Sequence, residues 1–355
     1  MFDELLKIVS LRISTIRATI ETNDKLRDIV FQDNAITQKL KENAAFSELI
    51  EVVPNQREWL IYDYCSVVTR LYAIYERFAE DLIANWLQIL PISCENYLDL
   101  GEKIQNTHRQ GVGRLLSDLN KNRFQHLSVE KVVQGLFSGI TSTGKYELLP
   151  EAFLLHEQNL RKEVLEKLFA DAGIENAWKW VTNHRKIKHF VEEIRGYQNT
   201  VEGELKQLID YRNEAAHGTV DEILGTQELL DLGDFVEALC KALAELVTYH
   251  VILRQASVGQ AKEIGKITEW YKKSQAVVAK VEDIELNVGE SLFLVLVNDK
   301  VSYCYLAKIE SIKINDISKN RVEIDSEAEV GLKFDTDARK GLTLYKCNQI
   351  ERGQL

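Results

Sequence analysis

The sequence feature that most constrains the fold is a long periodic segment that begins near Gln56 and ends at Pro91. Its apolar side chains recur along the whole segment: Trp59, Leu60, Tyr62, Tyr64, Val67, Val68, Leu71, Ile74, Tyr75, Phe78, Leu82, Ile83, Trp86 and Leu87. A helix on a protein surface is apolar along one stripe only. Because these side chains surround most of the circumference, the segment predicts a central helix inside a mainly α fold.

Residues 1–55 are also predicted to be helical and are interpreted as an N-terminal helical arm. An apolar stripe runs through Leu5, Ile8, Val9, Ile13, Ile16 and Ile20. The polar residues 21–24 predict a break in this helix, and the stripe itself must pack against another apolar surface. Two interpretations remain open: a helical hairpin that caps the next domain, which we favour, and a dimerisation arm.

Two further regions complete the helical part. Residues 92–175 are less regular, and the glycine group at 138–145 lacks the spacing of a phosphate-binding loop, so a flexible connection is predicted there. Helical periodicity returns at residues 227–254, through apolar residues from Leu229 to Ile252. This last segment is expected to close the helical bundle.

The hydrophobic period changes towards the C-terminus. Residues 256–283 are predicted to form a linker helix, because the stretch from Ala261 to Val281 is rich in lysine and moderately amphipathic. Short β-rich runs follow, separated by turn residues, at 291–297, 301–309, 321–324, 329–334 and 342–345. Residues 284–355 therefore predict a small antiparallel β-barrel.

Composition excludes several classes of protein. The 355 residues, 45% of them hydrophobic, favour two domains. The five cysteines form no CxxC pair and no ligand-like spacing with histidine, so we expect reduced thiols and neither a metal site nor a cofactor. The net charge of −11 disfavours nucleic-acid binding through bulk charge, while a local basic surface remains open. Without a membrane span or a secretory signal, the protein is expected to be cytoplasmic.

The stretch from Asp210 to Gly218 brings together the residues best suited to chemistry. Apolar residues at helical spacing precede it, and a glycine is the residue that most readily follows the end of a helix. Arg212, Asn213 and His217 therefore lie in the last turns of a predicted helix. At ~100° per residue, Arg212 and His217 stand ~140° apart, so both can border one cleft but cannot share one flat face.

A second candidate segment, residues 178–190, combines aromatic and basic side chains. Cations neutralise phosphates and aromatic rings stack on bases, so this segment is a candidate RNA-binding surface near the Arg212 motif. The basic residues assigned to RNA are Lys179, Arg185, Lys186 and Lys188. The alternative is that Trp178, Val181 and Phe190 belong to the core. A further basic stretch at residues 108–131 is more simply explained as a solvated face.

Glu76 is the candidate supporting residue. It lies beside Tyr75 and close to Phe78 on a crowded apolar surface of the predicted central helix, where a carboxylate normally needs a partner. One interpretation is a partly exposed or locally paired glutamate. The functional interpretation is a carboxylate that orients Arg212 or His217.

The run from Arg212 to His217 resembles the signature of the HEPN (higher eukaryotes and prokaryotes nucleotide-binding) superfamily: an arginine, a polar residue, and a histidine after four intervening residues at the end of a helix. The glycine that follows and the glutamate in the early aromatic-rich helix are similar to features of its RiboL-PSP and related bacterial subgroups. The resemblance implies that residues 56–255 form a HEPN-like bundle of four or five helices with an insertion.

This resemblance also implies an activity. HEPN nucleases are metal-independent endoribonucleases in which two domains pair and bring two copies of the motif to one cleft. The 2′-hydroxyl of RNA can attack the adjacent phosphorus, so the protein only moves protons and stabilises negative charge. His217 suits a general acid or base, Arg212 a phosphate clamp, and Asn213 an orienting role. The divergence of Arg212 and His217 gives an independent geometric reason to expect a homodimer.

Several alternatives remain open at this point. The resemblance implies roles in bacterial stress response or phage defence, including toxins controlled by an inhibitor or activator protein. One form of control modifies a tyrosine two residues after the histidine, where this chain has Thr219. Some superfamily members are not nucleases, so the second hypothesis is a non-catalytic RNA- or protein-binding module with a HEPN-like dimerisation scaffold. Residues 330–346 resemble the second-domain barrel of translational GTPases, which suggests targeting to ribosomes, tRNA or a protein partner.

Overall fold

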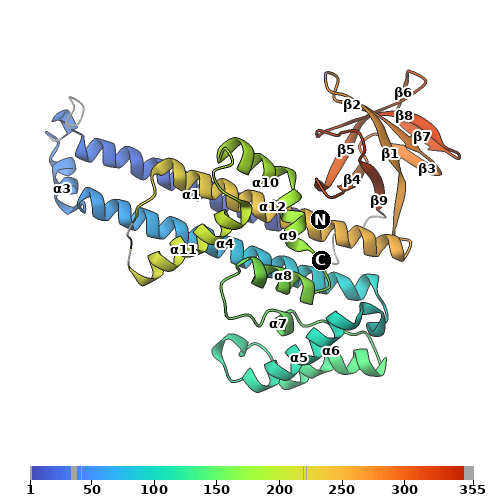
Figure 1. The fold of residues 1–355 in the computed structure, drawn as a ribbon, viewed down its shortest axis with the longest axis horizontal. Helices are drawn as coiled ribbons and strands as arrows, with labels where there is room; N and C mark the ends of the chain where they lie inside the picture. Colours follow the sequence, from blue (N-terminus) through green and yellow to red (C-terminus); the bar gives the residue numbers. More distant parts are fainter. Residues whose placement is uncertain (1, 33–37, 41, 219, 221, 348–355) are drawn as a thin grey trace.

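The computed structural model describes residues 2–32, 38–40, 42–218, 220 and 222–347. Helices occupy the N-terminal part and strands the C-terminal part, as the mainly α class with a terminal barrel predicted (Figure 1). The α-helices are α1 Asp3–Phe31, α3 Ala44–Val52, α4 Gln56–Ser93, α5 Glu102–Asp118, α6 Val129–Thr141, α7 Pro150–Phe153, α8 Lys162–Asp171, α9 Ala177–Asn183, α10 Arg185–His189, α11 Val201–His217 and α12 Thr226–Ser257.

The central helix is α4, and the prediction for residues 56–90 is confirmed. It contacts α1, α11 and α12 along its length, and its buried residues lie on more than one face (Figure 1). Asn55 caps the N-terminus by accepting a hydrogen bond from the N–H of Glu58 at 3.0 Å. Pro91 lies inside the last turn, so the helix ends at Ser93 instead of at the proline.

The N-terminal residues belong to the helical bundle. The apolar stripe of α1 is buried against α4 and α12, in agreement with packing on the neighbouring domain. The predicted break at residues 21–24 is wrong, because α1 is continuous from Asp3 to Phe31. Ion pairs explain how this polar stretch remains helical: Arg27, which is buried, pairs with Asp63 of α4 and with Asp24 one turn earlier.

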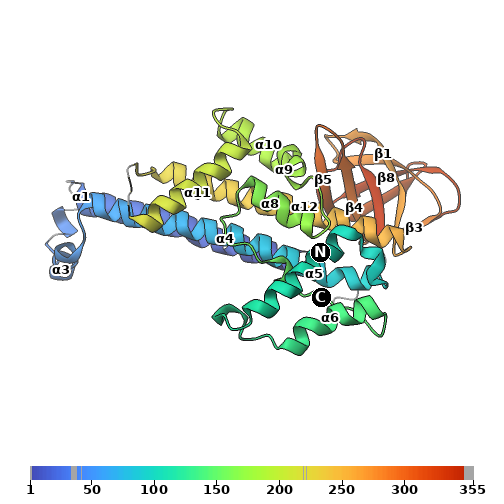
Figure 2. The same ribbon diagram turned by 60° about the horizontal axis from the view of Figure 1, so that its bottom comes forward.

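In the view of Figure 2, α5 and α6 of the insertion at residues 94–175 lie below α4, while α8 lies above it. It contains α5 to α8 and two short 3₁₀ helices, Tyr97–Leu100 and Asn122–Phe124. The expected flexible connection at 138–145 is only partly correct, since α6 continues to Thr141. A Cβ at Gly139 would lie 2.7 Å from the Tyr97 ring, so this glycine permits close packing.

The barrel begins earlier than expected, and the predicted linker helix at 256–283 is wrong. Residues 261–281 form two antiparallel strands, β1 Ala261–Tyr271 and β2 Ala276–Val281. Ala261, Ile264 and Ile267 are buried at a spacing of three, which imitates a helix. Register shifts after Glu263 and after Ile267 are the cause, because a bulge changes which residues face the core.

The remaining strands are β3 Ile284–Asn287, β4 Ser291–Val297, β5 Ser302–Ile314, β6 Ile317–Lys319, β7 Arg321–Ile324, β8 Ala328–Phe334 and β9 Thr343–Cys347. The order β4-β9-β1-β2-β8-β5 closes through the pairing of β4 with β5, which makes a closed antiparallel barrel of six strands. β6 pairs with β5, while β3 pairs with β7 outside this barrel. Closure removes the exposed edges of the sheet.

The barrel is docked directly on the helical part. Its own core is separate, but Phe293, Val295 and Cys304 pack into the apolar core of the helices. The N–H of Cys304 donates to Oε2 of the buried Glu245 on α12 at 3.1 Å. Only three residues separate the end of α12 from β1. The barrel is therefore held by core contacts and a buried polar group, with no linker helix between the two parts.

Candidate functional site

Helix α11 carries the motif and ends where the sequence predicted. Thr200 caps its N-terminus, with the N–H of Gly203 donating to the hydroxyl at 3.0 Å. Leu205, Leu208 and Ile209 are buried on the side that faces α4. Gly218 follows with a φ of 75°, and its N–H donates to the carbonyl of Glu214 at 3.0 Å. The left-handed C-cap therefore terminates α11 one residue after His217.

Arg212 and Asn213 form one half-buried group on α11. The guanidinium of Arg212 lies over the ring of Tyr72 on α4, 5.2 Å from its centroid. Its Nη1 donates to Oδ1 of Asn213 at 3.1 Å, and the same oxygen accepts from Nδ2 of Asn159 at 3.0 Å. The hydrogen-bond partner of Arg212 is a neutral amide, so the positive charge of Arg212 is positioned without being neutralised.

His217 is exposed in the last turn of α11 and stands apart from this group. Among the residues that the structure describes, its side chain makes no hydrogen bond or ion pair, and it does not contact Arg212. The predicted angular divergence is therefore retained in the folded chain. Thr219, which occupies the position of the family's modified tyrosine, lies outside the described residues.

Glu76 acts on Arg212 only through an intermediate side chain. Its Oε1 accepts a hydrogen bond of 2.8 Å from the hydroxyl of Tyr72, the tyrosine whose ring lies under Arg212. Burial raises the pKa of Tyr72, which keeps the phenol protonated as the donor. Glu76 thus fixes the orientation of the ring, and no direct ion pair between Glu76 and Arg212 forms within the described part of the chain.

A segment that sequence reasoning did not select completes the group. Residues 154–161, which connect α7 to α8, lie over α4: the N–H of Leu160 donates to the Tyr72 hydroxyl at 3.0 Å, and the Tyr75 hydroxyl donates to the Leu160 carbonyl at 2.9 Å. His156 Nε2 lies 3.1 Å from Oε1 of Glu80. Hydrogen bonding to Glu80 raises the pKa of His156, against the opposing effect of burial. The signal in the sequence was a polar run, residues 156–159, between two leucines.

The basic segment assigned to RNA lies elsewhere in the molecule. Lys179 on α9 pairs with Asp299 of the barrel at 2.7 Å, and Lys188 on α10 donates to the carbonyl of Lys300. The guanidinium of Arg185 lies over the ring of Tyr305 on β5, while Lys186 is exposed. The segment faces the barrel, whereas the end of α11 points away from it (Figure 1). The expectation that this segment neighbours the Arg212 motif is therefore wrong.

The structure agrees with the alternative interpretation of the aromatic residues in this segment, that they belong to the core. Trp178, Val181 and Phe190 are buried in the helical core, as one of the two interpretations had it. No group of three or more His, Cys, Asp or Glu side chains within the described ranges is arranged to hold a metal ion. Among the same residues, no helix combines the length and the apolar character needed to cross a membrane.

A helical bundle whose motif helix ends in arginine, asparagine and histidine defines a HEPN-type domain. The family model described as RiboL-PSP-HEPN matches residues 5–249, and the chain belongs to this family. The match includes α1, so the N-terminal arm lies within the family's range. Membership indicates a nuclease or an RNA-binding module.

Other comparisons add little. No curated protein matches the chain. Among solved structures, one similar chain is the C-terminal domain, in its selenomethionine variant, of a Geobacillus thermoleovorans putative U32 peptidase. The similarity covers 24% of this chain and 99% of that domain, with 10% sequence identity and a TM-score of 0.21. A score this low supports no argument about the barrel, whose resemblance to translational GTPases remains only a resemblance.

Proposed function

We propose that this chain is a metal-independent endoribonuclease in which the 2′-hydroxyl of RNA attacks the adjacent phosphorus at a cleft shared by two copies. The observation that carries the proposal is the state of Arg212. It is half-buried and fixed by an aromatic ring and an amide oxygen, both neutral. A guanidinium held in this way keeps its full charge for the non-bridging oxygens of a phosphate.

The other motif residues take complementary roles. His217, exposed at the helix end, removes the proton from the 2′-hydroxyl or delivers one to the leaving 5′-oxygen, since an imidazole can act as base or acid. Asn213 and Tyr72 hold the guanidinium, and Glu76 and residues 154–161 hold Tyr72 and Asn213 in turn. The products would be a 2′,3′-cyclic phosphate and a free 5′-hydroxyl.

The geometry of one copy supports the proposed homodimer. His217 and Arg212 do not meet on the same α11, so each site would combine Arg212 of one copy with His217 of the other. RNA, including tRNA or ribosomal RNA, is the proposed substrate. An inhibitor or activator protein is the proposed control, and toxin activity or antiviral defence the proposed setting. Five free cysteines are consistent with a cytoplasmic location.

The direct test incubates the purified chain with total RNA in EDTA. We expect cleavage that survives chelation, and losses of about 10²–10⁴-fold in Arg212→Ala and His217→Ala. Matched controls are Arg123→Ala and His126→Ala, both exposed in the connection between α5 and α6. If Arg212→Ala and His217→Ala cleave like their controls, the assigned site is wrong.

A mixing experiment tests the shared cleft. Neither Arg212→Ala nor His217→Ala is expected to cleave alone, but a mixed dimer has one site with both wild-type residues. Equal mixing with free exchange should restore about a quarter of the wild-type rate. No recovery from a mixture shown to exchange subunits, or a strictly monomeric mass at micromolar concentration, would contradict the composite site.

One observation favours the non-catalytic alternative. Within one copy the arginine and histidine do not converge, so a lone chain has no complete site. If RNA binds without being cut, and binding is lost in Arg212→Ala but kept in His217→Ala, the chain is an RNA-binding module of the same family. Where cleavage occurs, the fragment ends test the proposed chemistry, which predicts a 2′,3′-cyclic phosphate and a 5′-hydroxyl.

A further inference from the structure

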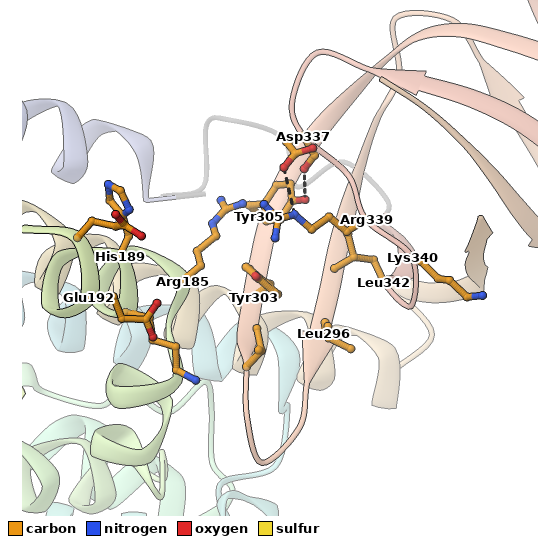
Figure 3. A pocket seen from close by; sticks show the side chains of 13 residues that line it. Arg185, His189, Glu192, Leu296, Tyr303, Tyr305, Asp337, Arg339, Lys340 and Leu342 are labelled. Atoms are coloured by element: carbon orange, nitrogen blue, oxygen red, sulfur yellow. Dashed lines mark hydrogen bonds and ion pairs between the residues drawn. The ribbon is translucent and has the colours of Figure 1, made fainter. Parts of the chain in front are cut away.

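A cleft of about 390 Å³ lies between α10 and the barrel (Figure 3). One wall is formed by α10 and the following turn of π-helix, Phe190–Ile194. The other wall is formed by β4, β5 and the connection between β8 and β9. The volume lies in the range of small-molecule sites, which occur preferentially where two domains meet. This cleft is separate from the end of α11, which lies towards the opposite end of the helices (Figure 1).

The centre of the cleft is Arg185. Its guanidinium lies 4.2 Å from the centroid of Tyr305 and 5.3 Å from that of Tyr303, and Figure 3 shows it reaching towards the barrel. The nearest carboxylate oxygen, Oε1 of Glu245, is 3.6 Å from Nη2, beyond ordinary hydrogen-bond distance. Nε of Arg185 is buried without a hydrogen-bond partner in the described structure. The planar cation is thus fixed by aromatic rings and retains donor capacity.

Further cations surround this centre. Lys188 donates to a neutral carbonyl, that of Lys300, and so its charge is not cancelled. Lys340 is exposed at the rim, and Figure 3 shows its side chain extending away from Arg185. Arg339 pairs with Asp337 at 3.2 Å, which removes that carboxylate from competition with an anionic ligand. Glu192, Glu193 and Asp337 also line the cleft, so its charges of both signs suit a ligand that has an anionic part and hydrogen-bond donors.

The other lining residues suit a ligand that has more than an anionic group. Leu296 and the exposed parts of Tyr303 offer apolar and aromatic surface. The carboxylates of Glu192 and Glu193 lie on the helical wall and can accept hydrogen bonds from hydroxyl or amino groups. Inorganic phosphate has no part that uses these groups. A nucleotide has all three parts: a phosphate, a planar base, and ribose hydroxyls.

We propose that the cleft between α10 and the barrel binds one nucleotide unit, with its phosphate on Arg185 and Lys188 and its base against Tyr303. The unit comes either from an RNA strand, which rests on the proposed function, or from a free nucleotide. Because the cleft is remote from His217, an RNA nucleotide held here is not the one that is cut. It anchors the strand at a distance from the cleavage site. A free nucleotide held here bridges the two domains.

The test uses the full-length chain carrying His217→Ala, so that its outcome does not depend on cleavage. Binding of a short fluorescein-labelled oligouridylate is followed by anisotropy, and binding of AMP, UMP and inorganic phosphate by calorimetry. The variants are Lys188→Ala, Lys340→Ala and Tyr303→Leu. Arg185 is left intact, because its removal would take one cationic partner from the buried Glu245 and so destabilise the fold. Lys272→Ala, at the exposed turn between β1 and β2, is the matched control.

We expect Lys188→Ala to weaken oligouridylate binding and to reduce the salt slope by ~0.7, as for one lost phosphate contact on a single strand. Lys340→Ala, at the rim, should weaken binding less. Tyr303→Leu should weaken binding about tenfold without changing the slope. The control should alter neither quantity. The same losses for AMP or UMP, with no effect of the three variants on RNA, assign the cleft to a free nucleotide and support the proposal.

Two results would overturn it. One is a dissociation constant that changes by less than about twofold in all three variants for both RNA and mononucleotides. The other is inorganic phosphate binding as tightly as AMP, which would leave no role for the base. Because binding is measured in the His217→Ala background, weaker ligand binding in these variants supports the nucleotide site whether or not the wild-type chain cuts RNA.

Discussion

Two arginines of the helical domain, Arg212 and Arg185, have similar partners and different surroundings. Each guanidinium lies over a tyrosine ring, that of Tyr72 for Arg212 and that of Tyr305 for Arg185. Arg212 completes its contacts with the amide oxygen of Asn213. Arg185 instead lies 3.6 Å from a carboxylate, Glu245, that is itself 6% exposed and pairs with the buried His184.

The difference in surroundings indicates which role each charge can have. A guanidinium among neutral partners keeps its field for a ligand, whereas one beside a buried carboxylate also holds the structure together. Arg212 can therefore be lost at a cost mainly to function. Arg185 joins the helices to the barrel, so its loss costs stability even where no ligand binds. Each of the following predictions can contradict this distinction or make it more specific.

The largest expected effect is on cleavage by Arg212→Lys. Lysine keeps the charge but loses the planar fork that reaches two phosphate oxygens and Asn213 together, so we expect the rate to fall about 10²-fold. The free energy of unfolding in urea should change by only about 0.5 kcal/mol, as for a substitution away from the core. A lysine variant that cleaves at the wild-type rate would mean that a point charge is sufficient and that the fork has no role.

The next effect is on stability, in Arg185→Ala. This change leaves the carboxylate of Glu245 buried with His184 and the N–H of Cys304 as its remaining partners. We expect a loss of about 2–3 kcal/mol in urea unfolding, somewhat less than for a buried charge with no partner left. Lys186→Ala, at the exposed neighbouring position, is the matched control. An equal effect of Arg185→Ala and Arg212→Ala on stability would remove the distinction between the two sites.

A smaller effect is the response of the interface to acid. Burial pushes the pKa of Glu245 up, but the hydrogen bond from His184, the charges of His184 and Arg185, and the Cys304 N–H together leave it below the ordinary value. A lowered pKa contributes stability that is present above the unfolded pKa of ~4.3 and is lost as pH falls through the folded value. Unfolding of Glu245→Gln should therefore depend less on pH below ~4.3 than unfolding of the wild type. Glu282→Gln, exposed on the barrel, should retain the wild-type dependence.

Much of the fold was predictable from hydrophobic period. The all-round apolar pattern of α4 placed it at the centre, and the change of period located most of the barrel. Residues 261–281 were misassigned because bulges in β1 bury residues at a spacing of three, which is a helical spacing. The continuity of α1 through residues 21–24 depends on Asp63, a partner on another helix that no local pattern contains.

The candidate site was predictable only in its local part. The positions of Arg212, Asn213 and His217 follow from helix geometry and from Gly218, which are properties of one short stretch. Their supports are long-range contacts: Asn159 reaches Asn213 from 54 residues away, through a connection with no periodic pattern. The basic segment at 179–188 was wrongly placed beside this motif, because composition indicates what a side chain can bind but not which surface it faces.

The smallest effect concerns the support of Arg212 by residues 154–161. Hydrogen bonding to Glu80 raises the pKa of His156, so the pair contributes stability that is complete below pH ~6.5 and is lost as pH rises through the folded value. Amide exchange in residues 154–161 should therefore accelerate between pH 6 and pH 8 beyond the intrinsic increase, by no more than the factor of about five that 1 kcal/mol allows. In His156→Gln the excess should vanish. Residues 128–141, around α6, serve as the internal control, and an equal excess there would show that the whole domain loosens and that His156 does not govern the support of Arg212.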